Sequence, residues 1–253
     1  MVSSGAPILG RLSGVTYAAL VRSRRMTRRF APLPQVSESV VADLIDLASC
    51  APSAGNAQGS DYVVLRDPGD RGRFWSAARP TPGTHRHAPG DRGEMAHAGP
   101  AGASASPWLA GVSAAPTLIV CVGDQDAYRR RYAEGDKGGI RPEEQDWPVP
   151  YWLTDVAMGA MILLLGARDA GLGALFFGVP GQRHIAVREA LGIPMSRQLV
   201  GVIALGHEAE RVRSSSLDRP RRRGPEVTHW GRFGVARHPL SQVSETMPGE
   251  STP

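Results

Sequence analysis

One segment, Tyr151 to Ala170, constrains the fold of this chain more than any other. Apolar residues cover nearly the whole circumference of the helix that it predicts, centred on Met158, Met161 and residues 162–165. A helix that is apolar on all sides does not lie at a solvated surface. We therefore expect it in the middle of a domain or at a subunit interface, ending at Gly171 in a left-handed C-cap.

The other predicted elements are short helices and strands that follow no regular βαβ repeat. Ser37 is typical of a helix N-cap, and the helix that it begins runs to Cys50 and stops before Pro52. Further helices are expected at 17–25, 71–78, 125–133 and 184–191, and strands at 62–65, 117–122, 174–177 and 199–205. The Asp-Pro-Gly-Asp sequence at 67–70 predicts a turn. This mixture favours an α+β layer over a doubly wound parallel sheet.

The composition predicts a folded protein. At 253 residues, with 42% hydrophobic and 21% charged residues, the chain can bury a core without disulfides or a structural metal. We expect a flexible N-terminus at 1–14, a single domain at 15–234 and a C-terminal tail at 235–253. Residues 79–113 are rich in small residues and proline, which predicts a mobile insert. We interpret His85, His87 and His97 in this insert as solvated and not as metal ligands, because no cysteine or carboxylate cluster lies nearby.

Charge and hydropathy argue against several classes of partner. The net charge of +5 comes almost wholly from arginine, and such an excess is only weak evidence for nucleic-acid binding, so we expect no nucleic-acid partner. The longest charge-free apolar stretch, 156–167, is shorter than the roughly 20 residues of a membrane span, so we expect no membrane partner. Residues 1–14 lack a signal-peptide pattern, and Cys50 and Cys121 are expected to be buried free thiols. We therefore expect a cytoplasmic protein.

Two short segments hold the candidate cofactor-binding residues. Residues 24–30 are Arg-Arg-Met-Thr-Arg-Arg-Phe, and residues 51–58 are Ala-Pro-Ser-Ala-Gly-Asn-Ala-Gln. Guanidinium groups bind phosphate in a fork, and small hydroxyl and amide groups suit the polar edge of a ring. Together the two segments predict a phosphorylated, ring-bearing cofactor. The Gly-Leu-Gly at 171–173 does not predict a dinucleotide fold, because it follows a helix and enters a strand.

The order of these segments resembles the FMN-dependent nitroreductase family, in an actinobacterial-type member. The resemblance covers about residues 17–234 and includes the apolar helix, the Gly-Leu-Gly, an aromatic-Gly step and a late arginine run before His229-Trp230, whereas the insert at 79–113 is unaccounted for. It implies a nitroreductase-like α+β fold: a mixed, mainly antiparallel sheet flanked by helices, with the long central apolar helix at the interface of a homodimer.

The resemblance also implies which residues bind FMN. Arg24, with Arg25 beside it, corresponds to the phosphate-binding position, and Arg28 to the flavin N1/C2 carbonyl region, where a cation stabilises the anionic reduced flavin. Met26 stands where the family usually has serine. The full implied set is Arg24, Arg25, Met26, Arg28, Pro52, Ser53, Ala54, Asn56, Phe177, Gly178, Arg221 and Arg223.

Three other parts of the set have implied roles. Residues 52–56 correspond to the loop that reaches the flavin from the neighbouring subunit, with Gly59-Ser60 where the family often has Pro-Trp. The backbone N–H of Gly178 corresponds to the group that faces flavin N5, after an aromatic residue that is often acidic in relatives. Arg221 and Arg223 correspond to a late basic pair that closes on the phosphate. Lys137 and residues 147–152 are candidates for the substrate side.

The implied activity is that of an FMN-dependent oxidoreductase. NAD(P)H would deliver hydride to flavin N5, and a small nitro, quinone or activated-alkene acceptor would then take its place, in ping-pong order. No side chain is an obvious nucleophile or general base, which agrees with flavin-mediated chemistry. Four alternatives stay open: a flavin-dependent dehydrogenase or oxidase in a natural-product pathway, a deazaflavin-using enzyme, a non-catalytic flavin-binding protein, and a nucleic-acid binder that uses the arginine clusters.

Overall fold

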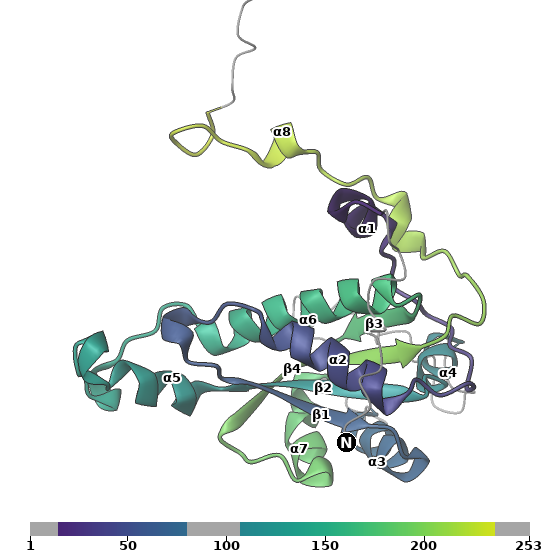
Figure 1. Ribbon diagram of the computed structural model, residues 1–253, viewed down its shortest axis with the longest axis horizontal. Helices are drawn as coiled ribbons and strands as arrows, with labels where there is room; N and C mark the ends of the chain where they lie inside the picture. Colours follow the sequence, from purple (N-terminus) through teal and green to yellow (C-terminus); the bar gives the residue numbers. More distant parts are fainter. Residues whose placement is uncertain (1–14, 80–106, 236–253) are drawn as a thin grey trace, which may run out of the picture. The chain divides into compact units, whose positions relative to one another are not determined.

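Four strands form one antiparallel sheet in the order β1-β2-β4-β3 (Figure 1). The structure is a computed structural model and describes residues 15–79 and 107–235. The strands are β1 Ser60–Leu65, β2 Thr117–Asp124, β3 Gly173–Phe177 and β4 Arg197–Gly206. Residues 118–122 of strand β2 are all apolar because both faces of the strand are covered: Leu118 and Val120 belong to one core cluster, and Ile119 between them belongs to the other.

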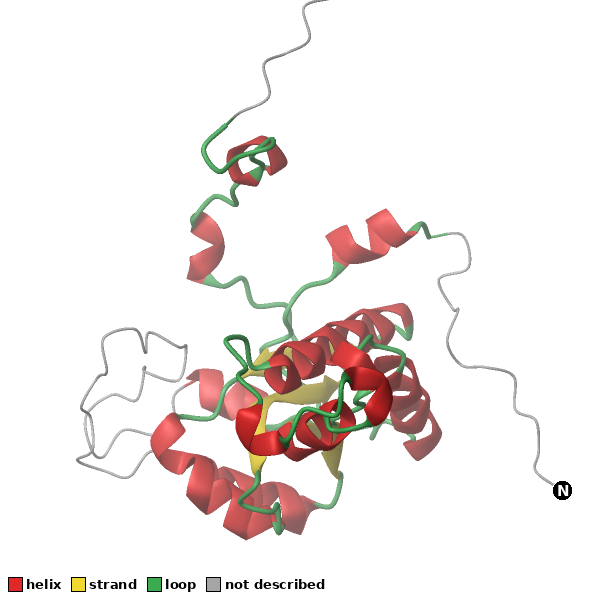
Figure 2. Cartoon of the chain, turned by 90° about the vertical axis from the view of Figure 1, so that its left-hand side faces the viewer, coloured by secondary structure: helices red, strands yellow, loops and turns green. Residues whose placement is uncertain are grey.

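Helices cover both faces of the sheet, as Figures 1 and 2 show from two directions. On one face Leu44 and Leu163 share a buried cluster with Ile203, and on the other Phe74 and Val187 share the second cluster. The helices of the first face are α2 Glu38–Ser49 and α6 Tyr151–Asp169, and those of the second are α3 Pro68–Ala78, α4 Pro107–Ser113 and α7 His184–Leu191. The predicted α+β fold with a mainly antiparallel sheet is confirmed.

The chain divides into two compact units, residues 1–212 and 213–253. The sheet and its helices lie in the first unit, which also contains α1 Tyr17–Ser23, α5 Gln125–Tyr132 and the 3-10 turns η1 Ala54–Asn56, η3 Gly135–Lys137, η4 Pro142–Glu144 and η5 Gly181–Arg183. The second unit holds the 3-10 turn η6 Ser215–Asp218 and helix α8 Gly224–Val227, and residues 217–235 are all exposed. The single domain expected at 15–234 therefore stays a prediction.

Helix α6 is the central helix that the sequence predicts. Val156 and Leu163 are fully buried on its inner side, whereas Met158 and Met161 on its outer side are 40% and 38% exposed. The helix ends at the predicted place, because Gly171 has a φ of +74° that suits a left-handed C-cap. None of the helices in residues 15–79 and 107–235 is both long and apolar enough to cross a membrane.

Three expectations are corrected. The 67–70 sequence does not form a turn but begins α3, because the Asp67 side chain accepts a hydrogen bond from the Gly69 amide over 2.7 Å and Pro68 fits the first helical position. Residues 107–113, expected in the mobile insert, form α4 with Val112 fully buried. Cys50 is exposed where α2 ends, whereas Cys121 is buried as expected. Residues 80–106 of the insert, which include its three histidines, lie outside the described residues.

Candidate functional site

The arginine-rich segment, residues 24–30, leaves α1 and runs beside β3. Met26 and Ala174 form a parallel bridge, and the Thr27 amide donates a hydrogen bond to the Ala174 carbonyl over 3.0 Å. The Thr27 and Phe30 side chains are buried, whereas the arginines around them are half-buried or exposed. The buried side chains therefore fix the backbone of the segment, between arginines that are less buried.

Two glycines allow this backbone to approach the rest of the fold closely. A Cβ on Gly173 would lie 2.6 Å from Thr27 Oγ1, and a Cβ on Gly111 would overlap the carbonyl oxygen of Arg28. The Phe30 amide also donates to the Gly111 carbonyl over 3.3 Å. Gly173, the second glycine of the Gly-Leu-Gly sequence, thus has a packing role. This role explains the glycine without requiring that the sequence bind a dinucleotide.

The members of the segment differ in their surroundings. Arg25 donates to the Arg24 carbonyl over 2.7 Å and to the Arg22 carbonyl in the last turn of α1, so it serves the helix end. Met26 is partly buried and packs against both core clusters. Arg28 donates to the Met26 carbonyl over 3.3 Å and, like Arg24, is half-buried. Arg24 and Arg28 are therefore the members best placed to meet a bound anion.

The aromatic-Gly step lies at the end of β3. The Phe177 ring is buried and stacks on Trp75, with ring centroids 5.5 Å apart and planes 6° apart. Its side chain therefore belongs to the core, and only its backbone can line a site. Gly178 is exposed, and apart from its chain neighbours no described atom lies within 4 Å of the position that a Cβ would take. The backbone at Gly178, directly after β3, is thus open to the approach of a planar ring.

The candidate cofactor loop, residues 52–58, has an unusual backbone. Gly55, Asn56 and Gln58 have φ values of +63°, +57° and +52°. Left-handed conformations are uncommon for residues other than glycine, and they persist where surrounding contacts hold them. One such contact is local, because the Ser53 hydroxyl accepts a hydrogen bond from the Gln58 amide over 3.0 Å.

Helices α5 and α6 hold this loop from outside. The Ala54 amide and the Tyr128 hydroxyl both donate to Asp155 Oδ2, each over 2.8 Å. Arg131 Nε donates to the Gly55 carbonyl over 2.8 Å. Burial and the hydrogen bond to Asp155 raise the pKa of Tyr128, so its hydroxyl stays protonated and can donate.

Two neighbours complete the support of the loop. The Arg131 guanidinium is itself fixed by two hydrogen bonds of 2.6 Å to the Asp136 carboxylate, which lower the pKa of Asp136. A Cβ on Gly59 would lie 2.8 Å from the Asp124 carbonyl oxygen and would overlap the Tyr128 ring. Glycine at position 59 therefore makes room for the tyrosine that holds the loop.

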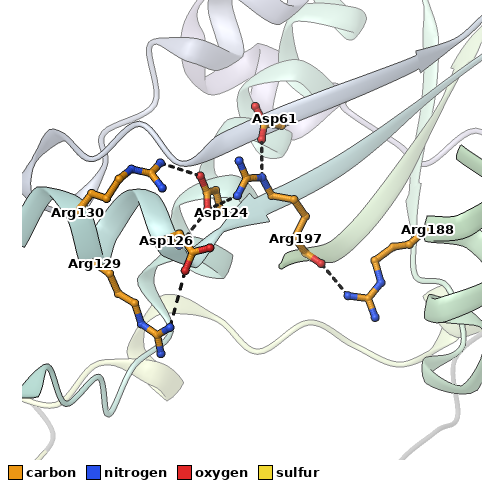
Figure 3. A network of polar contacts seen from close by, with 7 residues as sticks. All are labelled: Asp61, Asp124, Asp126, Arg129, Arg130, Arg188 and Arg197. Atoms are coloured by element: carbon orange, nitrogen blue, oxygen red, sulfur yellow. Dashed lines mark hydrogen bonds and ion pairs between the residues drawn. The ribbon is translucent and has the colours of Figure 1, made fainter. Parts of the chain in front are cut away.

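A polar network fixes the start of α5 (Figure 3). Asp124 caps this helix, accepting from the Asp126 amide over 2.9 Å, and forms ion pairs with Arg130 and Arg197. Arg197 Nε also lies 3.3 Å from the Asp61 carboxylate. The Asp124 side chain is only 6% exposed, so these pairs are shielded from solvent on one side. Because the network joins β1, β2 and β4, the helix that carries Tyr128 and Arg131 has a rigid base.

Aromatic side chains and Lys137 border the loop on the α5 side. A Cβ on Gly55 would lie 2.9 Å from Tyr132 Cε2 and 3.4 Å from Lys137 Cε. The Trp147 ring meets Tyr132 edge-on, with centroids 4.8 Å apart. Lys137, which is the one lysine in the sequence, and the 147–152 region are thus adjacent to the candidate cofactor loop.

The implied set of cofactor-binding residues therefore lies in three places. Arg24, Met26, Arg28 and Gly178 follow β3 and its neighbouring segment, whereas residues 52–56 are held by α5 and α6. Arg221 and Arg223 lie in the second unit, where both are exposed. Their role at a phosphate stays a prediction.

Sequence reasoning did not find Asp155, Tyr128 and Arg131. One signal was present for the first of them, because Asp155 is a lone carboxylate in the N-terminal half of an otherwise apolar helix. Buried charges in such a position need hydrogen-bond donors. Which donors surround Asp155 depends on which loop packs against α6, and sequence patterns over a few residues do not show this.

Comparison with known proteins places this geometry in context. The model of the Nitroreductase family matches residues 21–207. A 4-nitrobenzoate reductase from Nocardioides sp. strain LMS-CY is 29% identical over 211 residues, which cover 80% of this chain and 84% of that protein.

Solved structures show the same fold at lower identity. The ydfN protein of Bacillus subtilis is 19% identical, with a TM-score of 0.61 and coverage of 85% of this chain and 98% of that one. An FMN-dependent nitroreductase of Clostridium difficile R20291 is 17% identical, with a TM-score of 0.54 and coverage of 85% and 98%. At these identities the similarity establishes the fold alone.

Proposed function

Because this chain belongs to the nitroreductase family, whose members are generally NAD(P)H-dependent flavin oxidoreductases, we propose that it is an FMN-dependent oxidoreductase. FMN, when bound, would accept hydride from NAD(P)H at N5 and pass it to a small nitro, quinone or activated-alkene acceptor in ping-pong order. The protein's own contribution would be to bind the phosphate, to orient the ring and to set the charge around it.

The observation that carries this proposal is the fixed path of the arginine-rich segment along β3. Thr27 is buried against Gly173, so Arg24 and Arg28 occupy set positions beside β3, which ends at Phe177 just before Gly178. Prearranged cations stabilise anionic groups without reorganisation at the moment of reaction. We assign Arg24 to the phosphate and Arg28 to the N1/C2 edge of the ring. We assign Arg221 and Arg223, which come later in the sequence, as further contacts to the phosphate.

Gly178 supports the orientation of the ring. Its exposed backbone has room for a planar group, and a side chain at this position would occupy that room. In this proposal the Gly178 amide would face N5 of the bound flavin. The buried Phe177 ring, stacked on Trp75, keeps that amide in place.

The proposed active form is a homodimer formed through α6. Met158 and Met161 are 40% and 38% exposed, and Tyr151 near the start of the helix is 38% exposed. Large apolar side chains at such spacing indicate a surface that another protein surface covers. Residues 52–56 would then contact the cofactor of the partner subunit.

The acceptor would bind beside Lys137 and the Tyr132–Trp147 pair. The rings supply flat apolar surface, and the ammonium group supplies a positive charge close to the cofactor loop. Because the Nocardioides relative is named for 4-nitrobenzoate, that compound is a suitable first acceptor to test.

The decisive experiment is the visible spectrum of the purified protein before and after anaerobic NADH or NADPH. We expect the protein to show a flavin spectrum, either as isolated or after FMN is added. The flavin absorbance should bleach when either nucleotide is added, and it should recover when 4-nitrobenzoate follows. A flavin that no nicotinamide reduces would favour the oxidative or non-catalytic alternatives. A protein with no affinity for FMN would refute the proposal.

A further inference from the structure

Asp155 is a buried carboxylate inside the apolar helix α6, with its side chain among hydrogen-bond donors. The residue is 3% exposed. Its Oδ2 accepts from the Ala54 amide and the Tyr128 hydroxyl, each over 2.8 Å, and its Oδ1 accepts from the Thr154 hydroxyl over 3.0 Å. No arginine or lysine among the described residues forms an ion pair with it. A buried charge without a counterion is retained only where such donors satisfy it.

The loop that Asp155 contacts depends on outside support. Its left-handed residues Asn56 and Gln58 are held away from the conformations that their side chains favour. The two external hydrogen bonds act on neighbouring residues, one at the Ala54 amide and the other at the Gly55 carbonyl. Arg131, the donor to Gly55, reaches the loop from the surface with a side chain that is 21% exposed, so Asp155 provides the deeper of the two anchors.

The same carboxylate lies on the helix proposed to join two subunits. Asp155 precedes the exposed Met158 by three residues, which is almost one helical turn. A rigid helix therefore connects the exposed apolar surface at Met158 to the Ala54 peptide that Asp155 holds. The Tyr128 hydroxyl fixes the carboxylate from α5, which is itself anchored by the Asp124 network.

We propose that Asp155 is a positioning residue for the cofactor loop: its carboxylate, oriented by Tyr128, sets the Ala54 peptide and thereby the placement of Ser53 and Asn56. The cofactor part of this inference depends on the proposed function, but the bracing of the loop does not. Asp155 does not touch the reacting atoms. It acts through the peptide that it holds.

The identity of the side chain matters because a carboxylate only accepts hydrogen bonds. Both donors at Oδ2 are satisfied by one oxygen, and Thr154 satisfies the other. Asparagine can present its oxygen to the same two donors and its NH2 group to the Thr154 oxygen, so Asp155→Asn should keep the geometry with a weaker, uncharged acceptor. Alanine removes the acceptor altogether.

Amide hydrogen exchange in the cofactor-free protein tests the bracing directly. In the wild type we expect the Ala54 amide to be protected. Loss of a charge-assisted hydrogen bond should make it exchange roughly ten- to a hundredfold faster in Asp155→Ala, with a smaller increase in Asp155→Asn and in Tyr128→Phe. The amides of β2 should keep their protection in every variant. Thr154→Val removes the contact to Oδ1 and the hydroxyl's bond to the Tyr151 carbonyl but neither contact at Oδ2. It is the matched control and should leave Ala54 unchanged.

The same variants give a second readout with the cofactor. Titration with FMN, followed by flavin fluorescence, should show about tenfold weaker binding for Asp155→Ala, partial recovery in Asp155→Asn and wild-type binding for Thr154→Val. Unchanged exchange at Ala54 in both Asp155→Ala and Tyr128→Phe would overturn the inference. So would equal loss of protection in β2, which would indicate a general structural role.

Failure of the proposed function gives a different result. If the wild-type protein binds no FMN while Ala54 is still protected through Asp155, the cofactor role is overturned and the bracing stands.

Discussion

The contact between Gly173 and Thr27 makes a sharp prediction about how the arginine-rich segment is held. An alanine Cβ at position 173 would lie 2.6 Å from Thr27 Oγ1 and 3.0 Å from Thr27 Cβ. Thr27 cannot move aside freely, because it is β-branched, buried, and hydrogen-bonded through its amide to Ala174. Overpacking of this kind costs about 1–3 kcal/mol, so we expect Gly173→Ala to lower the free energy of unfolding by about 2 kcal/mol.

The assay is urea unfolding of the cofactor-free protein, with FMN affinity measured in parallel. The destabilisation should lower the melting temperature by roughly 2–4 °C for each kcal/mol. FMN should also bind more weakly, because Arg24 and Arg28 move with the displaced backbone. Gly72→Ala in α3 is the control: an added Cβ there meets nothing within 4 Å, so the better helix propensity of alanine should stabilise by about 0.5–1 kcal/mol.

A second substitution identifies the cause. Thr27→Ala removes both the Oγ1 and the Cγ2 atoms that crowd position 173, so Thr27→Ala with Gly173→Ala should be more stable than the two separate effects predict, by about 1 kcal/mol. The proposed packing would be refuted if Gly173→Ala had the same urea midpoint of unfolding as the wild type. It would also be refuted if the free-energy changes of the two single variants simply added in the double variant.

Three further predictions concern the site itself. Gly178→Val should leave the unfolding midpoint close to that of the wild type, because nothing lies within 4 Å of the new Cβ, yet it should abolish flavin binding or flavin reduction. A variant with normal flavin content and turnover would show that Gly178 is not part of the site. Arg24→Ala and Arg221→Ala should each weaken FMN binding by about 1.5–3 kcal/mol for each charged hydrogen bond lost, measured by fluorescence titration, and two fully flavin-loaded variants would contradict the phosphate assignment. Lys137→Met should raise KM for 4-nitrobenzoate about tenfold while KM for the uncharged methyl ester changes little, and equal effects on both acceptors would argue against a role for its charge.

The sequence by itself determined the local elements and the two candidate segments. Ser37 was recognisable as a cap, and it accepts from the Val40 amide over 3.3 Å as expected. The continuous apolar run of β2 and the all-round apolar surface of α6 are properties of neighbouring residues, so both could be predicted without tertiary information. The Asp-Pro-Gly-Asp sequence misled because the same residue types favour turns and helix N-termini.

Only the tertiary structure decided which residues meet. Asp155 and the Ala54 amide are 101 positions apart, and nothing in either segment specifies the other. The same holds for Gly173, where a side chain is excluded because Thr27, from a distant segment, packs against it. It also holds for Phe177, whose ring packs in the core against Trp75. Periodicity and capping follow from backbone geometry over a few residues, whereas these contacts follow from how whole helices and strands pack.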